Sequence, residues 1–174
     1  MQRKIFVWCI FLTLLLGITI PASAQSRSVL YEEWNVDIFD VNTTNNSFYV
    51  RETLKVRFSG TFRFGSRVVA LNNLDRISNV RVVEAGTPLT PSCIGEIPGT
   101  YCVSNVQEGV SIVYYFTRTI TNASQVFQIE YQVDGAIRVY DGGDQISWRA
   151  IPEEKFGFPV SSSTVTVRLP PGYA

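Results

Sequence analysis

The sequence predicts an all-β fold, a two-sheet antiparallel β-sandwich of immunoglobulin-like or jelly-roll-like type, preceded by an N-terminal signal-peptide helix. Three observations support this prediction. Apolar and polar residues alternate through most of the chain after residue 24, as is typical of half-buried strands. Turn signals rich in Asn, Gly and Ser separate these segments, and no sustained helical period is present. A closed barrel is the structural alternative.

The first 24 residues have the three parts of a secretory signal peptide. A basic segment (Met1–Lys4) precedes an apolar run (Ile5–Ile20), and small residues up to Ala24 predict cleavage before Gln25. The apolar run is shorter than the roughly 20 residues that a membrane-spanning helix needs, so cleavage is favoured over an uncleaved anchor. We therefore expect the protein to be exported.

Composition limits the function of the mature part, residues 25–174, which we expect to form one extracytoplasmic β-sandwich domain. The whole sequence has 15 Lys and Arg against 15 Asp and Glu, so we expect no nucleic-acid partner, which would need a clustered basic face. It has no histidine, which removes the commonest general base and the usual catalytic zinc sites. We expect no enzyme activity and no cofactor; catalysis by carboxylates alone is the enzymatic alternative.

The clearest strand covers residues 48–58, with Phe48, Val50, Leu54 and Val56 on one face and polar residues on the other. A second strand at 31–41 precedes it, and the polar residues Asn42–Asn46 predict that the two form a hairpin. A later hairpin is predicted between residues 110–118 and 125–133, through the turn Thr121–Ser124. Further strands are expected at residues 67–71, 77–84, 137–140, 145–149 and 164–169.

Two cysteines, Cys93 and Cys102, remain after the signal peptide. In an oxidising compartment this pair predicts a disulfide bond that stabilises the fold by about 2 to 3 kcal/mol. A zinc site is disfavoured because two thiolates without histidine make an incomplete shell, and the spacing is not that of a C-x-x-C redox pair. The pair lies in a long break with little periodicity, residues 85–109, which we expect to be functional or held by the disulfide.

Glu52 is the one charged residue on the apolar face of its strand. A buried carboxylate needs a partner, and Arg63 or Arg67, shortly downstream, could supply it in a buried ion pair. A structural ion pair is favoured over the alternative, a ligand-binding carboxylate inside the sandwich.

Other motifs carry weaker signals. Asp141–Asp144 resembles a calcium loop but offers too few oxygen ligands, so a turn is favoured. Asn42, Asn45 and Asn122 match glycosylation acceptors, which matter only if the host modifies exported proteins. A set of aromatic residues could form a sugar-stacking platform, although core packing is favoured: Trp34, Tyr114, Tyr115, Phe116, Trp148, Phe156 and Phe158.

An ordered set of motifs resembles a known family. The set comprises Tyr31–Val41, Phe48–Leu54, Phe58–Phe62, Ile129–Ala136, Tyr140–Trp148, Phe158–Val160 and Val165–Pro170. It resembles the N-terminal domain of the predicted membrane proteins called domain of unknown function family 2207. The resemblance implies a signal peptide, an extracytoplasmic β-sandwich and a downstream transmembrane region with a cytoplasmic part. It brings no activity with it.

This sequence stops at Ala174, just after the Leu-Pro strand. Membrane association is therefore expected only through a segment absent from it, and C-terminal truncation of the domain stays open. We predict a non-enzymatic interaction or sensory module at the cell envelope, with an unknown protein or envelope component as its partner. A carbohydrate- or polymer-binding module is the alternative, motivated by the aromatic residues and the acidic turn.

Overall fold

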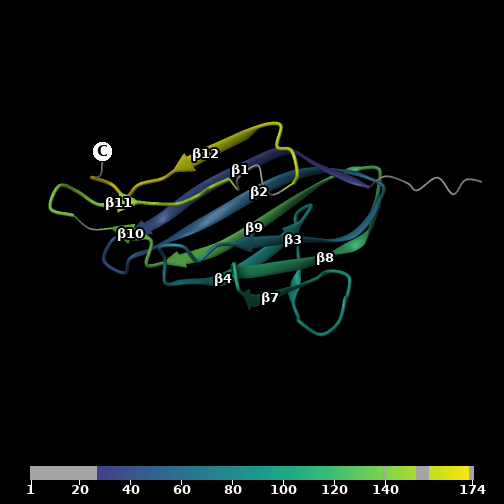
Figure 1. Ribbon diagram of the computed structural model, residues 1–174, viewed down its shortest axis with the longest axis horizontal. Coiled ribbons are helices and arrows are strands. Elements are labelled where there is room, and N and C mark those ends of the chain that lie inside the picture. Colours follow the sequence, from purple (N-terminus) through teal and green to yellow (C-terminus); the bar gives the residue numbers. More distant parts are fainter. Residues whose placement is uncertain (1–26, 139, 152–156, 173–174) are drawn as a thin grey trace, which may run out of the picture.

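The computed structural model describes residues 27–138, 140–151 and 157–172 (Figure 1). The predicted signal-peptide helix lies outside these residues. The described part contains β-strands and no helix long and apolar enough to cross a membrane. The strands are β1 (Ser28–Asn42), β2 (Ser47–Ser59), β3 (Thr61–Val69), β4 (Arg76–Glu84), β5 (Thr87–Pro88), β6 (Thr90–Pro91), β7 (Thr100–Val106), β8 (Gly109–Thr121), β9 (Ser124–Asp134), β10 (Ile137–Arg138), β11 (Gln145–Ile146) and β12 (Ser163–Val167).

The strands form two large sheets and one small one. The first large sheet has the order β12-β1-β2-β9-β4-β5, the second has the order β3-β8-β7-β6, and β10 pairs with β11. Figure 1 shows β1, β2 and β9 layered over β3 and β8. The predicted two-sheet sandwich is therefore confirmed. Most neighbouring strands are antiparallel, but β12 runs parallel to β1, and β6 parallel to β7.

The hydrophobic core lies between the two large sheets. Every second residue of β2 points inward, so Phe48, Val50, Leu54 and Val56 are almost completely buried, as the alternation predicts. Strand β8 lies in the opposite sheet and faces β2 across the core, whereas β9 lies next to β2 in the same sheet. Their inward residues are Ile112, Tyr114 and Phe116 on β8 and Phe127, Ile129, Tyr131 and Val133 on β9.

The predicted hairpin between β1 and β2 is confirmed, because the two strands pair in antiparallel register across the turn at 43–46. The predicted hairpin between β8 and β9 is wrong. Strand β8 pairs with β3 and β7 in one sheet, whereas β9 pairs with β2 and β4 in the other. Residues 121–123 are thus a corner where the chain changes sheets.

The β2–β3 connection changes sheets at the same place, and the two corners are joined. The amide of Gly60 donates to the side-chain oxygen of Asn122 (2.7 Å), and the amide of Asn122 donates to the carbonyl of Gly60 (3.1 Å). Both residues have positive φ, which Gly and Asn adopt at low cost. An alternating strand with an apolar face fits either side of a sandwich, so the alternation of β8 and β9 alone could not separate a hairpin from a corner.

The long break at 85–109 also contains more structure than its sequence indicates. Strands β5, β6 and β7 lie within it, and β7 pairs with β8 from Tyr101 to Val106. Most side chains of β7 are exposed, so the strand lacks the apolar alternation that reveals a half-buried strand.

Candidate functional site

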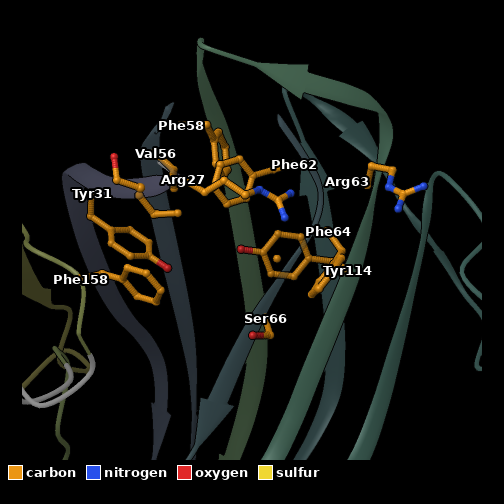
Figure 2. A pocket seen from close by; sticks show the side chains of 13 residues that line it. Arg27, Tyr31, Val56, Phe58, Phe62, Arg63, Phe64, Ser66, Tyr114 and Phe158 are labelled. Carbon is orange, nitrogen blue, oxygen red and sulfur yellow. The ribbon is translucent and has the colours of Figure 1, made fainter. Parts of the chain in front are cut away.

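An apolar pocket of about 320 Å³ opens at the end of the sandwich where β1 begins and β2 passes into β3. Its walls come from β1, the end of β2, β3, β8 and the segment before β12 (Figure 2). The pocket lies beside β3, which among the described strands pairs with β8 alone. The lining residues are Arg27, Ser28, Val29, Tyr31, Val56, Phe58, Phe62, Arg63, Phe64, Gly65, Ser66, Tyr114 and Phe158.

Gly65 allows the ring of Tyr114 to form one wall of the pocket. The two residues are paired in the β3–β8 register, so they share a face of the sheet. A Cβ atom on Gly65 would lie 2.5 Å from the Tyr114 ring, which is closer than real contacts allow. The missing side chain at Gly65 therefore lets the Tyr114 ring lie against the backbone of β3.

Two tyrosine hydroxyl groups face the pocket. Tyr31 and Tyr114 extend toward each other from opposite walls in Figure 2. Burial raises the pKa of both phenols above the ordinary value, so both hydroxyl groups are protonated near neutral pH. They can donate and accept hydrogen bonds inside a chamber whose walls are otherwise mostly apolar.

Two arginines lie at the rim. The Arg27 guanidinium donates a hydrogen bond to the carbonyl of Thr61 and lies 4.8 Å from the centroid of the Phe62 ring. Arg63 is exposed, and its guanidinium points away from the centre of the pocket (Figure 2). Both also line a second, shallower hollow of about 390 Å³ together with Thr61 and Thr119. None of the described residues that line the two hollows is acidic.

A buried ion pair lies deeper in the sandwich. The Arg67 Nε lies 2.9 Å from one carboxylate oxygen of Glu52, and Nη2 lies 3.0 Å from the other. The Tyr131 hydroxyl group donates a further hydrogen bond to this carboxylate, at 2.6 Å. Of the two partners that the sequence left open, the structure places Arg67 against Glu52 and leaves Arg63 at the exposed rim of the pocket.

The surroundings of Arg67 keep it charged. Burial alone would lower the pKa of Arg67, but the facing Glu52 carboxylate outweighs burial and raises this pKa above its ordinary value. The guanidinium also lies 5.3 Å from the centroid of the Trp34 ring and donates a hydrogen bond to the carbonyl of Val68. With its carboxylate oxygens bonded inside the protein, Glu52 joins the two sheets, since it comes from β2 and Arg67 from β3.

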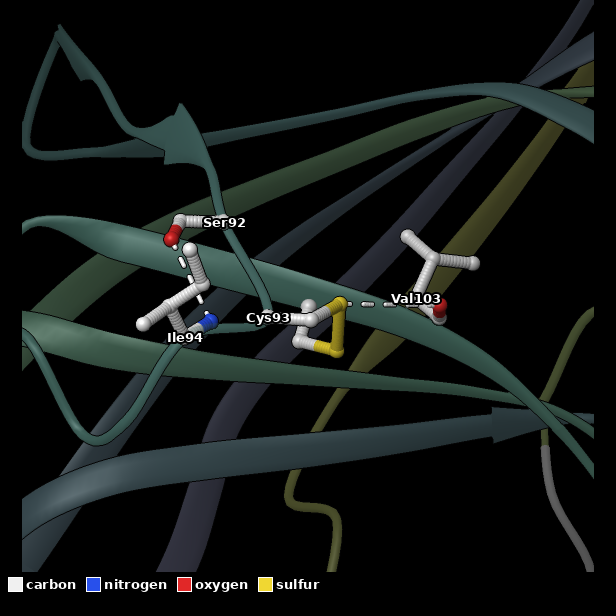
Figure 3. The surroundings of a disulfide bond; sticks show 5 residues. Ser92, Cys93, Ile94 and Val103 are labelled. Carbon is white, nitrogen blue, oxygen red and sulfur yellow. Dashed lines mark hydrogen bonds between the residues drawn. A yellow bond between two sulfur atoms is a disulfide. The ribbon is translucent and has the colours of Figure 1, made fainter.

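A disulfide bond joins Cys93 and Cys102, whose Cα atoms are 4.7 Å apart. It connects the loop after β6 to strand β7 beside Val103, as Figure 3 shows. Next to it, the amide of Ile94 donates a hydrogen bond to the Ser92 hydroxyl group (3.4 Å). None of the residues that line the pocket comes from β7, and the bond ties the Cys93 loop to that strand.

The other residues that the sequence singled out as possible site residues lie in different parts of the fold. Residues Asp141 and Gly142 form a turn, and no group of three metal-binding side chains is found among the residues that the structure describes. Of the proposed aromatic platform, Trp34, Tyr114 and Phe116 are buried, Tyr115 and Trp148 are half-buried, and Phe158 is exposed and lines the pocket. Phe156 lies outside the described residues. Asn42, Asn45 and Asn122 are all exposed.

The pocket could not be predicted from the sequence. Its lining residues come from separate parts of the chain, so no local motif exists. One signal was present: a glycine inside an aromatic-rich strand, Phe62–Ser66, often marks a close approach by another group.

The fold and the pocket together define an all-β sandwich domain with an apolar pocket at one end of the sandwich. The chain belongs to the family described as the N-terminal domain of predicted membrane proteins (DUF2207), whose model matches residues 35–173. No curated protein matches the chain.

Among solved structures, a mutant M1 zinc metallopeptidase from Deinococcus radiodurans shares 9% identity with a TM-score of 0.42, covering 62% of this chain and 21% of that one. The mutant enzyme with a bound tripeptide substrate shares 10% identity with a TM-score of 0.42, covering 66% and 22%. This chain thus spans about a fifth of the length of those enzymes.

Proposed function

We propose that this domain is a non-enzymatic interaction or sensory module on the extracytoplasmic side of the cell envelope, and that it works by binding a small, largely apolar ligand. The pocket of about 320 Å³ between β1 and β3 is the observation that carries this proposal. Its size lies at the lower end of the range for small-molecule sites, about 300–1,000 Å³, and such sites combine apolar walls with a few polar groups. Here Tyr31 and Tyr114 supply the polar groups inside the chamber.

Three features support the extracytoplasmic, non-enzymatic part of the proposal. The N-terminus has the pattern of a cleavable signal peptide, and the Cys93–Cys102 disulfide suits an oxidising compartment. The family description is that of a predicted membrane protein. The sequence has no histidine, so the commonest acid–base and nucleophile-activating groups are missing.

A carbohydrate-binding platform has less support. Sugar stacking needs ring faces that are open to solvent. Trp34, Tyr114 and Phe116 pack in the core, Tyr115 and Trp148 are half-buried, and exposed Phe158 lines the apolar pocket.

Binding is tested with a neutral fluorescent apolar probe, 1-aminoanthracene, whose emission rises in an apolar chamber. Val29 lies half-buried in the pocket wall, and Val29→Phe should fill the chamber and abolish the signal. The matched control is Val126→Phe, at an exposed valine on β9 outside the pocket. A wild-type domain that binds no probe, or a signal that Val29→Phe leaves unchanged, contradicts the proposal.

The location is tested by expressing the whole sequence in a bacterial host and measuring the mass of the secreted product. We expect a mature chain that begins at Gln25 and carries the disulfide. A product that keeps residues 1–24 and stays in the cytoplasm would contradict the extracytoplasmic placement.

A further inference from the structure

We infer that the pocket binds a single-chain anionic amphiphile, with its apolar chain between the aromatic walls and its acidic head group at Arg27 and Arg63. This inference rests on the proposed function, because it names the chemistry of the ligand that the same pocket takes. It follows from the charge at the rim, the position of the shallow hollow and the size of the chamber.

The charge at the rim is positive and is not balanced locally. Half-buried Arg51 pairs with Glu130 (2.7 Å) and exposed Arg76 with Asp134 (2.9 Å), whereas exposed Arg81 and Arg118 have no ion pair among the described residues. In the described part of the chain, Arg27 and Arg63 have no such ion pair. The two guanidinium groups line the shallow hollow next to the apolar opening and favour an anion in that hollow.

The two hollows meet at these arginines. Arg27 and Arg63 line both the aromatic chamber and the shallow hollow, whose other walls are Thr61 and Thr119. A ligand that crosses from one hollow to the other would therefore have an apolar part among rings and a polar part among guanidinium and hydroxyl groups. Carboxylate and phosphate groups match this donor set, because guanidinium groups and threonine hydroxyls both donate hydrogen bonds to their oxygens.

The size of the chamber selects a single chain. At about 320 Å³ it is roughly twice the apolar cavity of ~150 Å³ that holds one benzene molecule. That space suits one alkyl chain of medium length rather than the two long chains of a bilayer lipid. The ligand is therefore a monomer taken from solution, and the site does not act as a membrane-docking face.

The test measures displacement of 1-aminoanthracene from the wild-type domain by three compounds with the same chain: decanoate, decanol and decyltrimethylammonium, each below its micelle concentration. We expect decanoate to compete about tenfold better than decanol and better still than the cation. Arg27→Gln and Arg63→Gln should each weaken decanoate about three- to tenfold while leaving decanol unchanged. Arg81→Gln, at an exposed arginine of β4 outside both hollows, is the matched control and should change neither.

The outcomes separate the two proposals. If the three compounds compete equally and Val29→Phe abolishes all of them, the pocket binds ligands but the anionic head group is wrong. If neither the probe nor any compound binds, the proposed function fails as well. If decanoate does not compete but the domain sediments with vesicles that contain phosphatidylglycerol, the site is a membrane surface and the inference is overturned. Circular dichroism of each variant confirms that it is folded.

Discussion

Glu52→Gln is the substitution that tests the core of the sandwich most sharply. It keeps the size of the side chain but removes its charge, so the buried guanidinium of Arg67 loses its counter-ion. The side chains of Glu52 and Arg67 are 0% and 7% exposed, and water cannot replace the lost interaction. Breaking a buried pair by removing one partner costs about 3–5 kcal/mol. We expect the free energy of unfolding to fall by that amount.

Two further variants provide comparisons for this loss in the free energy of unfolding. Glu130→Gln breaks the Arg51–Glu130 pair, whose side chains are 34% and 19% exposed, and should cost no more than about 1 kcal/mol. The double variant Glu52→Leu with Arg67→Met removes both charges and fills their space with apolar atoms. It should recover most of the stability lost in Glu52→Gln, because the desolvation of both ions is avoided.

The assay is equilibrium unfolding in urea at neutral pH, followed by tryptophan fluorescence, with the disulfide bond intact. The change in midpoint at constant slope gives the loss in the free energy of unfolding. A loss below about 1 kcal/mol for Glu52→Gln, or a double variant less stable than this single one, would show that the buried charge of Arg67 does not depend on Glu52 in this way. Unchanged binding of 1-aminoanthracene in Glu52→Gln supports a structural carboxylate; lost binding with normal stability supports a ligand-binding one.

Three other predictions concern the loop, the pocket wall and alkaline pH. Replacing Cys93 and Cys102 with serine should lower the unfolding free energy by about 2 to 3 kcal/mol in urea titrations, and an equally stable serine variant would contradict this. Gly65→Ala should lower the free energy of unfolding by about 1–3 kcal/mol, because its Cβ would meet the Tyr114 ring. Gly142→Ala is the control and should be neutral, because the space around Gly142 is open. Equal melting temperatures for the two variants would exclude the predicted clash. Burial raises the pKa of Tyr114 above 10.0, so its protonated phenol stabilises the fold fully below pH 10.0, and this contribution is lost as the pH rises through the raised value. Tyr114→Phe should therefore show a shallower fall in stability above pH 10.0 than the wild type, and identical slopes would count against this assignment.

Much of the fold could be predicted because inward and outward residues alternate along β1, β2 and β9. A strand with one apolar face must bury it, so the positions of Phe48, Val50 and Ile129 in the core follow from the pattern. The pattern could not show which sheet a strand joins. The β8–β9 corner depends on the contact between Gly60 and Asn122, and these residues are far apart in the sequence.

Less of the candidate site could be predicted from the sequence. Glu52 is visible in the sequence because its charge interrupts an apolar face. Which arginine pairs with it, Arg63 or Arg67, depends on the geometry of β3, where a bulge lies between Phe62 and Phe64. The pocket depends on the spacing between two sheets and on a ring lying across Gly65, and neither is encoded in a local pattern.

Amide chemical shifts of the isotope-labelled domain, recorded during a titration with decanoate, show whether the pocket between β1 and β3 is a ligand site. Saturable shifts should be confined to residues around the chamber, such as Val29, Phe64 and Gly65. The amides of Val103 and Val106, on β7 away from the chamber, should not move. Shifts that are largest on β7, or that grow without saturating across the whole domain, would contradict the claim.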